Sequence, residues 1–359
     1  MSGLALSSPP RCVLLCGYYG EHNLGDDALL EVLIRQLPEG WQPVITAFDS
    51  EAVREMVPNA AVINRRSLNS TLKSIREVEA VVLGGGSLLQ DSTSFRSLIY
   101  YIIIILAARI RSKPVILWGQ GLGPLKKSLS RFLVSRALNY ASSITWRDAA
   151  SMELAYRLKI KTPMTMAPDP VWTHQTTNHQ GGGDIVLCWR PSKLLNENGW
   201  TLLLKALEQL CHQTGLSVTW LAFHALQDAD LFQTLRSKGL ISDTLAKKST
   251  TIIANNIEQA NDIFSDASLV IAMRLHALIL AISSQCPTVG LSYDPKVEAA
   301  ARTAGAAWSS LDNLPDLKIL VSQWITSLST APSISRLDAI RNESHEHERM
   351  LKISLSNIQ

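Results

Sequence analysis

Arg274 and His276 are the two residues whose types and spacing most clearly suggest chemistry. Leu275 separates them, and they lie between an apolar run at 269–272, which predicts a buried strand, and an apolar block from Ala277, which predicts a helix. An arginine offers a planar fork of N–H donors that suits a phosphate or a carboxylate, and a histidine can give or take a proton near neutral pH. A helix that starts at a strand end is also where parallel sheets bind anions. The alternative interpretation is a salt-bridged arginine beside a histidine of the core.

A glycine-rich segment at residues 17–28, with the sequence GYYGEHNLGDDA, follows the first predicted strand. Its glycines, Gly20 and Gly25 among them, would let a ligand approach the backbone, and Asn23 and Asp26 add polar groups. The segment is neither G-x-G-x-x-G nor a P-loop, because no GK[ST] follows. It predicts an anion- or sugar-binding loop. The alternative is a tight turn in which Asp26 or its neighbour Asp27 caps the next helix.

Glycines or polar groups end most of the other predicted strands as well. Gly84–Gly86 follow the strand at 80–83 and predict a loop that presents backbone N–H groups, Gly85 and Gly86 included. A second such segment, 119–124, contains Gln120. Further polar strand ends are Arg147-Asp148, Asp169, Arg190, His224 and the segment 292–296 with Lys296. Because carboxyl ends of parallel strands meet at one edge of a sheet, these groups predict a ligand cleft along that edge.

Strand and helix patterns alternate along almost the whole chain, as in the βαβ units of parallel sheets. Residues 173–184, which include three consecutive glycines, predict a flexible linker between two such series. We therefore expect an α/β protein with two Rossmann-like doubly wound domains, 1–173 and 184–311, in a GT-B-like arrangement. A helical tail follows at 312–359. The first-half strands are expected at 11–16, 43–48, 61–64, 80–83, 114–118 and 143–146, and the second-half strands at 185–189, 217–223, 251–254, 269–272 and 288–291.

Four histidines fall outside the predicted strand ends and are expected to be solvated. His174 and His179 lie in the predicted linker, and His345 and His347 lie in a charged stretch of the tail. No His, Cys, Asp and Glu spacing resembles a metal site, so we predict no metal.

The composition bounds the function classes. The 359 residues are 46% hydrophobic and 18% charged, which is typical of a globular chain, and 359 residues suit two domains. The net charge of +3, without a basic cluster interleaved with aromatic residues, does not favour a nucleic-acid binder. The five cysteines form no CxxC pair, and Cys12 and Cys16 would lie about 13 Å apart on one strand, so reduced thiols are expected.

Targeting and membrane signals are weak. Residues 1–10 lack the charged, apolar and cleavage regions of a signal peptide. The longest apolar block, 98–108, is shorter than the roughly 20 residues that span a bilayer and predicts a buried helix. We expect a cytoplasmic protein.

Eight of these segments, in order over residues 17–297, resemble the motifs of the polysaccharide pyruvyl transferases, in particular the CsaB type. The matching stretches are 17–28, 84–87, 119–124, 147–148, 169–171, 190–191, 273–276 and 292–297. The resemblance implies a GT-B-like enzyme that moves the enolpyruvyl group of phosphoenolpyruvate to a sugar. The CsaB type forms a 4,6-linked pyruvate ketal on a hexosamine of a lipid-linked cell-wall precursor. No other cofactor is implied, and the lipid-linked acceptor suggests peripheral contact with the inner face of the cell membrane.

The resemblance also assigns site residues. In the family, the Arg-Leu-His element contacts phosphoenolpyruvate, which places Arg274, Leu275 and His276 at the donor. Arg147, Arg190 and Lys296 would add cations for its two anionic groups, and His276 would be the general acid. The general base is either Asp26 or Asp169. The second domain would hold the donor and the first the acceptor, near Gly20, Asn23, Gly25, Gly85, Gly86 and Gln120.

Two other functions fit parts of the same pattern. A GT-B glycosyltransferase with a nucleotide-sugar donor would place a carboxylate for the ribose in the second domain, where Glu258 and Glu298 are candidates. A non-catalytic anion-binding subunit of a cell-wall assembly complex would keep the arginines and would not need His276. The sequence does not specify the acceptor sugar or the oligomeric state.

Overall fold

The computed structural model describes residues 11–92 and 94–358, which divide into two compact units. The first unit contains residues 11–21, 29–170 and 344–358, and the second contains residues 22–28 and 171–343. Residues 1–10, where the sequence shows no signal-peptide pattern, lie outside the described residues. Each unit is built around one parallel sheet, which confirms the predicted α/β class with two doubly wound domains.

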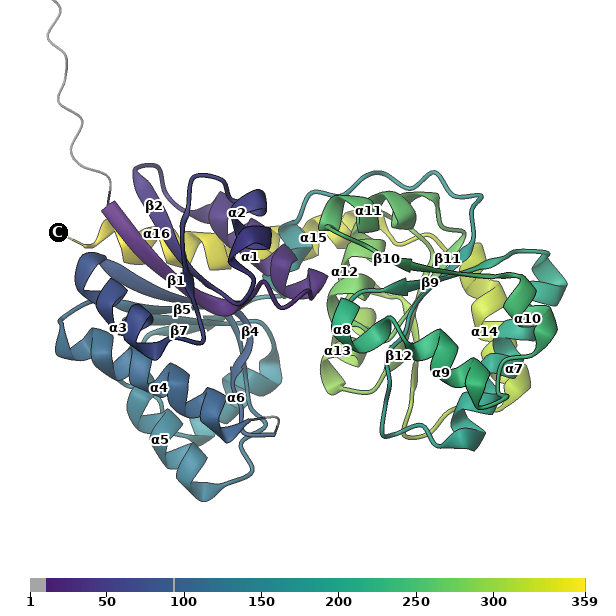
Figure 1. Ribbon diagram of the computed structural model, residues 1–359, viewed down its shortest axis with the longest axis horizontal. Coiled ribbons are helices and arrows are strands. Elements are labelled where there is room, and N and C mark those ends of the chain that lie inside the picture. Colours follow the sequence, from purple (N-terminus) through teal and green to yellow (C-terminus); the bar gives the residue numbers. More distant parts are fainter. Residues whose placement is uncertain (1–10, 93, 359) are drawn as a thin grey trace, which may run out of the picture. The chain divides into compact units, whose positions relative to one another are not determined.

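The first unit has a seven-stranded parallel sheet in the order β3-β2-β1-β4-β5-β6-β7 (Figure 1). The order reverses between β1 and β4, which pair directly through Cys16 and Leu83. The strands are β1 (Arg11–Tyr19), β2 (Trp41–Ala47), β3 (Ala61–Asn64), β4 (Ala80–Leu89), β5 (Val115–Leu122), β6 (Ser143–Trp146) and β7 (Met164–Met166). The helices between them are α1 (Leu24–Gln36), α2 (Ser50–Met56), α3 (Leu68–Glu77), α4 (Phe95–Ile110), α5 (Ser128–Leu138) and α6 (Ala149–Arg157).

The second unit has a six-stranded parallel sheet in the order β10-β9-β8-β11-β12-β13, with its reversal between β8 and β11. Its strands are β8 (Ile185–Cys188), β9 (Val218–Ala222), β10 (Ser249–Ile253), β11 (Leu269–Ala272), β12 (Thr288–Ser292) and β13 (Ala307–Ser310). A 3-10 helix, η1 (Pro170–Thr173), precedes them. The helices are α7 (Glu197–Thr214), α8 (Ala225–Asp228), α9 (Leu231–Ser237), α10 (Asp243–Lys247), α11 (Ile257–Asp266), α12 (Leu275–Ser283) and α13 (Pro295–Ala304).

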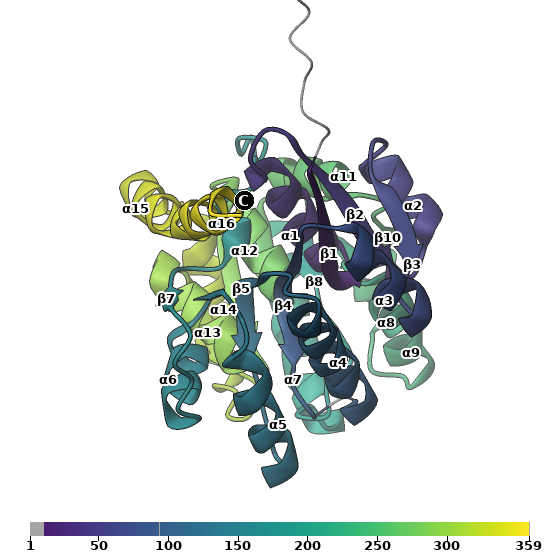
Figure 2. The same cartoon turned by 90° about the vertical axis from the view of Figure 1, so that its left-hand side faces the viewer.

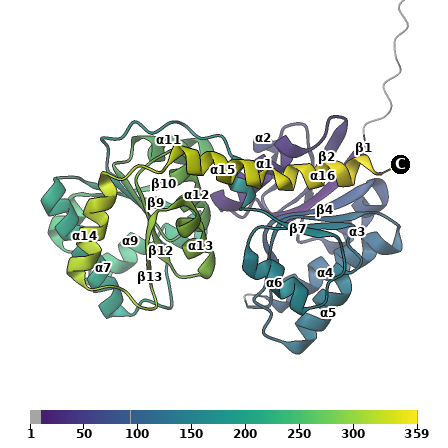
Figure 3. The ribbon, with the colours of Figure 1, turned by 180° about the vertical axis from the view of Figure 1, so that it is seen from behind.

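The predicted tail is helical, as expected, and it is divided between the two units. It comprises α14 (Leu317–Leu328), α15 (Ile334–Ser344) and α16 (Glu346–Ser356). In the second unit α14 packs on α7, and in the first unit α16 packs on β5 and β6 (Figures 2 and 3). The strand β13, which the sequence analysis missed, completes the second sheet beside β12.

The prediction of a loop at Gly84–Gly86 is wrong, because these glycines continue strand β4 and are buried. Gly86 pairs with Gln120 of β5. A Cβ atom at Gly84 would lie 2.3 Å from Tyr19 Oη, and one at Gly85 would lie 2.7 Å from Leu29 Cδ1. The glycines are therefore required because other side chains pack directly on the backbone of the strand.

The segment 17–28 is also not the loop that its glycines predict. Strand β1 extends to Tyr19 and helix α1 begins at Leu24, so Gly25 and Asp26 lie in the first turn of a helix. Asn23 caps this turn, because its Oδ1 accepts a hydrogen bond from the Gly25 N–H at 3.2 Å. The alternative interpretation, a tight turn before a capped helix, named Asp26 or Asp27 as the cap, whereas Asn23 makes the capping hydrogen bond.

The predicted flexible linker is bound to the body of the second unit. The N–H groups of His179 and Gln180 donate to the carbonyls of Ser284 and Ser265, at 2.9 and 2.8 Å. His174 is 6% exposed, which corrects its expected solvation. His347 is fully buried, so its solvation was also predicted wrongly, whereas His345 is exposed as expected.

The five cysteines are free thiols, four of them buried. Within residues 11–92 and 94–358, no helix combines the length and the apolar character needed to span a membrane.

Candidate active site

The polar ends of four neighbouring strands in the second sheet form the candidate site. The strands β9, β8, β11 and β12 lie side by side. His224 comes shortly after β9, Arg190 after β8 and Arg274 after β11. Arg190 and Arg274 follow the two strands where the sheet order reverses. Doubly wound sheets bind ligands at this position, because the loops on either side of the reversal diverge there.

Arg274 caps the start of α12 and is held by a carboxylate that the sequence analysis did not identify. Its Nε and Nη2 donate to Asp228 Oδ2 and Oδ1, at 3.0 and 2.5 Å, and Nη2 also donates to Gln227 Oε1 at 3.1 Å. The salt-bridged arginine considered above is therefore present. The pair still leaves a donor for a ligand, because Nη1 has no hydrogen-bond partner among the described residues.

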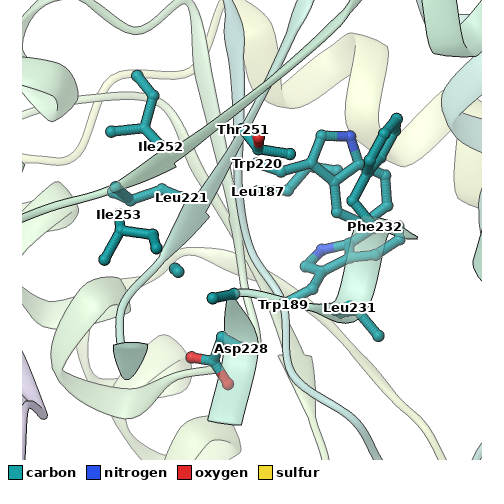
Figure 4. A pocket seen from close by; sticks show the side chains of 12 residues that line it. Leu187, Trp189, Trp220, Leu221, Asp228, Leu231, Phe232, Thr251, Ile252 and Ile253 are labelled. Carbon is teal, nitrogen blue, oxygen red and sulfur yellow. The ribbon is translucent and has the colours of Figure 1, made fainter. Parts of the chain in front are cut away.

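Asp228 also borders a small cavity of about 70 Å³ that is lined mostly by apolar residues. Figure 4 shows Asp228 at one end of this cavity and the rings of Trp220 and Phe232 at the other. Only 1% of the Asp228 side chain is exposed. Since burial penalises an isolated charge, removal of either partner would leave the other charge buried and unpaired.

His276 lies directly against the start of α1. A Cβ atom at Gly25 would lie 2.2 Å from His276 Nδ1, so only glycine leaves room for the imidazole in this position. Asp26 follows Gly25, and its Oδ2 accepts a hydrogen bond from Asn23 Nδ2 at 2.5 Å. The structure thus brings four predicted residues together: Asn23, Gly25, Asp26 and His276.

Backbone hydrogen bonds fix this first turn of α1 to the end of β9. The Leu24 N–H donates to the Phe223 carbonyl at 3.1 Å, and the Ala225 N–H donates to the His22 carbonyl at 3.0 Å. Asn23 and His224 form an antiparallel bridge between these bonds. This pairing explains why residues 22–28 belong to the second unit, although the strand before them belongs to the first.

His224 is a second histidine of the site and was recognised in the sequence only as a strand end. It is 8% exposed, and its backbone N–H donates to Asp228 Oδ2 at 2.9 Å. Burial, reinforced by the positive charge of Arg274, lowers the pKa of His224 to about 4. Its imidazole is therefore neutral at pH 7.

Arg190 and Lys296 provide the remaining predicted cations of this unit. The Arg190 guanidinium stacks on the Tyr293 ring, 4.7 Å from its centroid, and Nη1 donates to the Tyr293 hydroxyl at 3.0 Å. Lys296 lies in the first turn of α13, and its backbone N–H donates to the capping Asp294 at 3.0 Å.

In the first unit, Arg147 and Asp169 form a buried ion pair. Arg147 Nη1 donates to Asp169 Oδ2 at 2.9 Å, and Nη2 donates to Ser87 Oγ at 3.2 Å. The Arg147 N–H also donates to the Gln120 carbonyl at 3.0 Å. A predicted donor-binding cation and a predicted base are therefore partners of each other.

Helix α16 and the last residue of α15 hold the backbone next to Asp169. The carbonyl of Pro168 accepts hydrogen bonds from His347 Nε2 at 2.9 Å and from Ser344 Oγ at 3.2 Å. The Thr145 hydroxyl, 2.8 Å from His347 Nδ1, completes the contacts of this ring. Because the carbonyl can only accept, the proton of the neutral imidazole is on Nε2. Burial lowers the pKa of His347 to about 4.

Gly20 and Gln120, two further predicted site residues of the first unit, make packing contacts or hydrogen bonds within that unit. Gly20 has a φ of +69°, and a Cβ there would lie 2.7 Å from the Asp49 carbonyl oxygen. Gln120 is buried, and its Nε2 donates to the carbonyls of Leu83 and Gly85, at 3.2 and 3.0 Å. Among the described residues, no group of three or more His, Cys, Asp or Glu side chains could hold a metal ion.

Several solved structures share this fold at low sequence identity. The UDP complex of Anabaena Alr3699/HepE aligns with a TM-score of 0.59 at 11% identity, over 96% of this chain and 98% of that one. The UDP-GlcNAc 2-epimerase of Methanocaldococcus jannaschii aligns with a TM-score of 0.65 at 12% identity, over 95% of this chain and 99% of that one. A glycosyltransferase from Rickettsia africae ESF-5 aligns with a TM-score of 0.59 at 14% identity, over 97% of this chain and 94% of that one. These similarities support the predicted GT-B-like fold and carry no function.

The family model comparison is more specific, whereas no curated protein matches the chain. The model described as "Polysaccharide pyruvyl transferase" matches residues 23–295, most of the chain, from Asn23 before α1 to Pro295 at the start of α13. The matched range contains Arg190, His224, Arg274 and His276 of the second unit and ends one residue before Lys296. The chain therefore belongs to the polysaccharide pyruvyl transferase family.

Proposed function

We propose that this protein transfers the enolpyruvyl group of phosphoenolpyruvate to a hexosamine of a lipid-linked cell-wall precursor, as a CsaB-type enzyme. One observation carries the proposal: two arginines follow the strands at the sheet reversal, and His276, two residues after Arg274, lies against Gly25, which directly precedes Asp26. Cations, a proton donor and a carboxylate are therefore available within one unit.

The donor is a small dianionic or trianionic molecule, and the strand-end cluster suits it. Arg274 would bind one anionic group through Nη1, held in orientation by Asp228, and Arg190 would bind a second, supported by Tyr293. Lys296 adds a third cation. The backbone N–H groups at the start of α12, from Leu275 onward, face the same strand end and favour an anion.

The chemistry requires one proton donor and one acceptor. His276 would donate a proton to the methylene carbon, which becomes the methyl group, and leave a cation-like centre at the neighbouring carbon. A sugar hydroxyl attacks this centre and loses its proton to a carboxylate. The bond to the phosphate oxygen then breaks, phosphate departs, and a second hydroxyl closes the ketal while its proton leaves with the phosphate.

Asp26 is the better supported base of the two candidates. Asp169 is 5% exposed and lies in the first unit, where its Oδ2 accepts a hydrogen bond from Arg147 Nη1 at 2.9 Å. Asp26 is half-buried and directly follows Gly25, the residue in contact with His276. Arg147, the other predicted cation, is bound to Asp169 within the first unit. Gly20, Gly85 and Gly86 are required by close packing in the first unit, and Gln120 donates its side-chain hydrogen bonds there. Their contact with the acceptor stays a prediction.

The glycosyltransferase alternative rests on the fold alone. Structures with a similar fold include complexes with UDP and UDP-sugars, but at 11–12% identity these ligands belong to those proteins. A nucleotide-sugar enzyme would be stabilised against heat by a UDP-sugar and not by phosphoenolpyruvate. A non-catalytic anion-binding subunit would be stabilised by phosphoenolpyruvate without consuming it.

Phosphate release from phosphoenolpyruvate tests the proposal. We would measure it with and without a synthetic lipid-linked N-acetylmannosaminyl–N-acetylglucosamine acceptor, for the wild type and for His276→Asn and Lys205→Gln. Lys205 is an exposed residue of α7 and serves as the control. We expect acceptor-dependent release that His276→Asn abolishes and Lys205→Gln preserves. Binding of phosphoenolpyruvate without release in the wild type would refute the enzymatic proposal for this acceptor.

A further inference from the structure

We infer that the outer surface of helices α4 and α5 docks the protein on an anionic lipid membrane. This α4–α5 surface is made of exposed apolar side chains from both helices and the cations between them. It belongs entirely to the first unit, and the two helices pack against each other on one face of the sheet (Figure 1). The inference concerns a surface separate from the strand-end residues of the proposed reaction.

Apolar side chains are exposed in positions that share a helix face. Leu106 and Ile110 lie four residues apart near the end of α4, and Ile110 is 81% exposed. Leu129 and Phe132 lie three residues apart in α5, and Phe132 is 57% exposed. Tyr140 follows α5 and is also exposed. Other apolar side chains of α4, such as Ile102 and Ile105, are buried and form its core face, whereas Leu106 and Ile110 point away from that core.

Cations surround these apolar groups, and acidic residues are absent from the same stretch. The sequence from residue 92 to residue 147 contains no Asp or Glu. Six exposed cations accompany α4 and α5: Arg96, Arg109, Lys126, Lys127, Arg131 and Arg136. The nearest preceding carboxylate, Asp91, is occupied by the backbone N–H groups of Lys126 and Lys127. This surface is therefore far more basic than the net charge of +3 suggests.

Ring contacts join the two helices into one surface. Arg109 of α4 lies over the Tyr140 ring that follows α5, 5.9 Å from its centroid, and Arg136 lies 5.4 Å from the Phe132 centroid. At the other end Lys127 lies 4.7 Å from the Phe95 centroid. The sequence analysis found no basic cluster with interleaved aromatic residues, because these partners are separated in sequence by up to 32 positions.

The combination fits a lipid headgroup layer better than another polyanion. Exposed aliphatic side chains such as Leu106, Ile110 and Leu129 gain free energy in the acyl boundary, and nothing in a nucleic acid backbone would bury them. Lysines and arginines beside them bind anionic headgroups, at about 1 kcal/mol or a factor of about five in affinity for each. A pattern of apolar and basic residues on one helical surface is typical of peripheral membrane binding.

Co-sedimentation of the full chain with vesicles tests the inference. The vesicles contain phosphatidylcholine alone or phosphatidylcholine with phosphatidylglycerol, and the variants are Ile110→Ser with Phe132→Ser, and Arg131→Gln with Arg136→Gln. We expect binding to the anionic vesicles only, weakened by salt. The double substitution Arg131→Gln with Arg136→Gln should lower the affinity for anionic vesicles about 25-fold, because each cation contributes a factor of about five. The matched controls, Ile319→Ser and Lys205→Gln with Lys318→Gln, change exposed residues of the second unit and should bind like the wild type.

Three results would overturn the inference: equal binding to both vesicle types, no binding to either, or equal loss in the control variants. A Phe132-dependent dimer in solution without vesicle binding would instead assign the surface to a second copy of the chain. Activity on a water-soluble acceptor fragment separates this test from that of the proposed reaction, because the surface variants should retain it. Membrane docking and the pyruvyl transfer proposal can thus fail independently.

Discussion

Replacement of Gly25 by alanine tests the contact on which the proposed acid catalysis depends. The new Cβ would lie 2.2 Å from His276 Nδ1, whereas ordinary contacts of such an atom begin near 3.4 Å, so the imidazole must move by about 1.2 Å. The same Cβ would lie 3.0 Å from His276 Cγ, so a small rotation of the ring does not relieve the clash. A misplacement of about 1 Å in a catalytic group costs about 100-fold in rate. We therefore expect kcat/KM to fall about 100-fold, which corresponds to about 2.7 kcal/mol.

The stability of the Gly25→Ala variant should change little. Alanine is favoured over glycine in a helix by up to about 1 kcal/mol, which offsets part of the local clash. The assay is phosphate release under saturating acceptor, together with the urea midpoint of unfolding. Gly199→Ala is the matched control, because Gly199 also lies in the first turn of a helix. The nearest atom to its new Cβ would be the flexible end of Leu195, at 3.0 Å, and the next is at an ordinary 3.7 Å.

A double-mutant cycle decides whether the loss acts through the imidazole. In a His276→Ala background, Gly25→Ala should cause no further loss, because the ring that it displaces is already missing. An unchanged kcat/KM in the single Gly25→Ala variant would refute the reasoning. So would an equal loss in both backgrounds, since the effect would then come from the backbone of α1.

Further variants test the other charged groups. Asp228→Asn leaves Arg274 buried without its carboxylate, so we expect a loss of about 3–5 kcal/mol in the free energy of unfolding and a higher KM for phosphoenolpyruvate. The control Glu298→Gln changes an exposed ion pair and should lower the free energy of unfolding by less than about 1 kcal/mol. Urea denaturation measures both variants. In the folded protein the pKa of His347 is about 4, compared with 6.5 in the unfolded chain. Between pH 6.5 and pH 4 the unfolded state therefore binds more protons, and the free energy of unfolding falls as the pH drops through this range. In His347→Gln, the free energy of unfolding should decrease less steeply over this pH range. Part of the decrease should remain, because His224 has a similarly lowered pKa. Asp26→Asn should lower kcat by about 10²–10⁴-fold with an unchanged thermal midpoint, and a full kcat would exclude Asp26 as the base.

The sequence was sufficient for the alternation of strands and helices and for the polar strand ends. Runs such as 269–272 are continuous and apolar because both faces of a parallel strand are covered, and this signal is local. The ends of strands were harder to place. Gly84–Gly86 predict a loop by their residue type, yet they continue β4 because Tyr19 and Leu29 pack on them, and those contacts come from residues more than 50 positions away.

The site was predicted in its residue types and not in its pairings. Arg274 and His276 were found from their position at a strand end, but Asp228, 46 residues away, carries no local signal that it neutralises Arg274. His347 was misplaced because charged neighbours surround it in sequence, whereas one face of α16 is buried on β5 and β6. Long-range partners of this kind follow from the packing of whole elements.

The mass of the acceptor after reaction tests the central claim most directly. A lipid-linked or soluble hexosamine acceptor would be incubated with the protein and either phosphoenolpyruvate or a UDP-sugar, and then analysed by mass spectrometry. The proposed function predicts the mass of one pyruvate ketal with phosphoenolpyruvate, no change with the UDP-sugar, and no ketal with His276→Asn. A sugar added from the UDP-sugar, with no product from phosphoenolpyruvate, would contradict it.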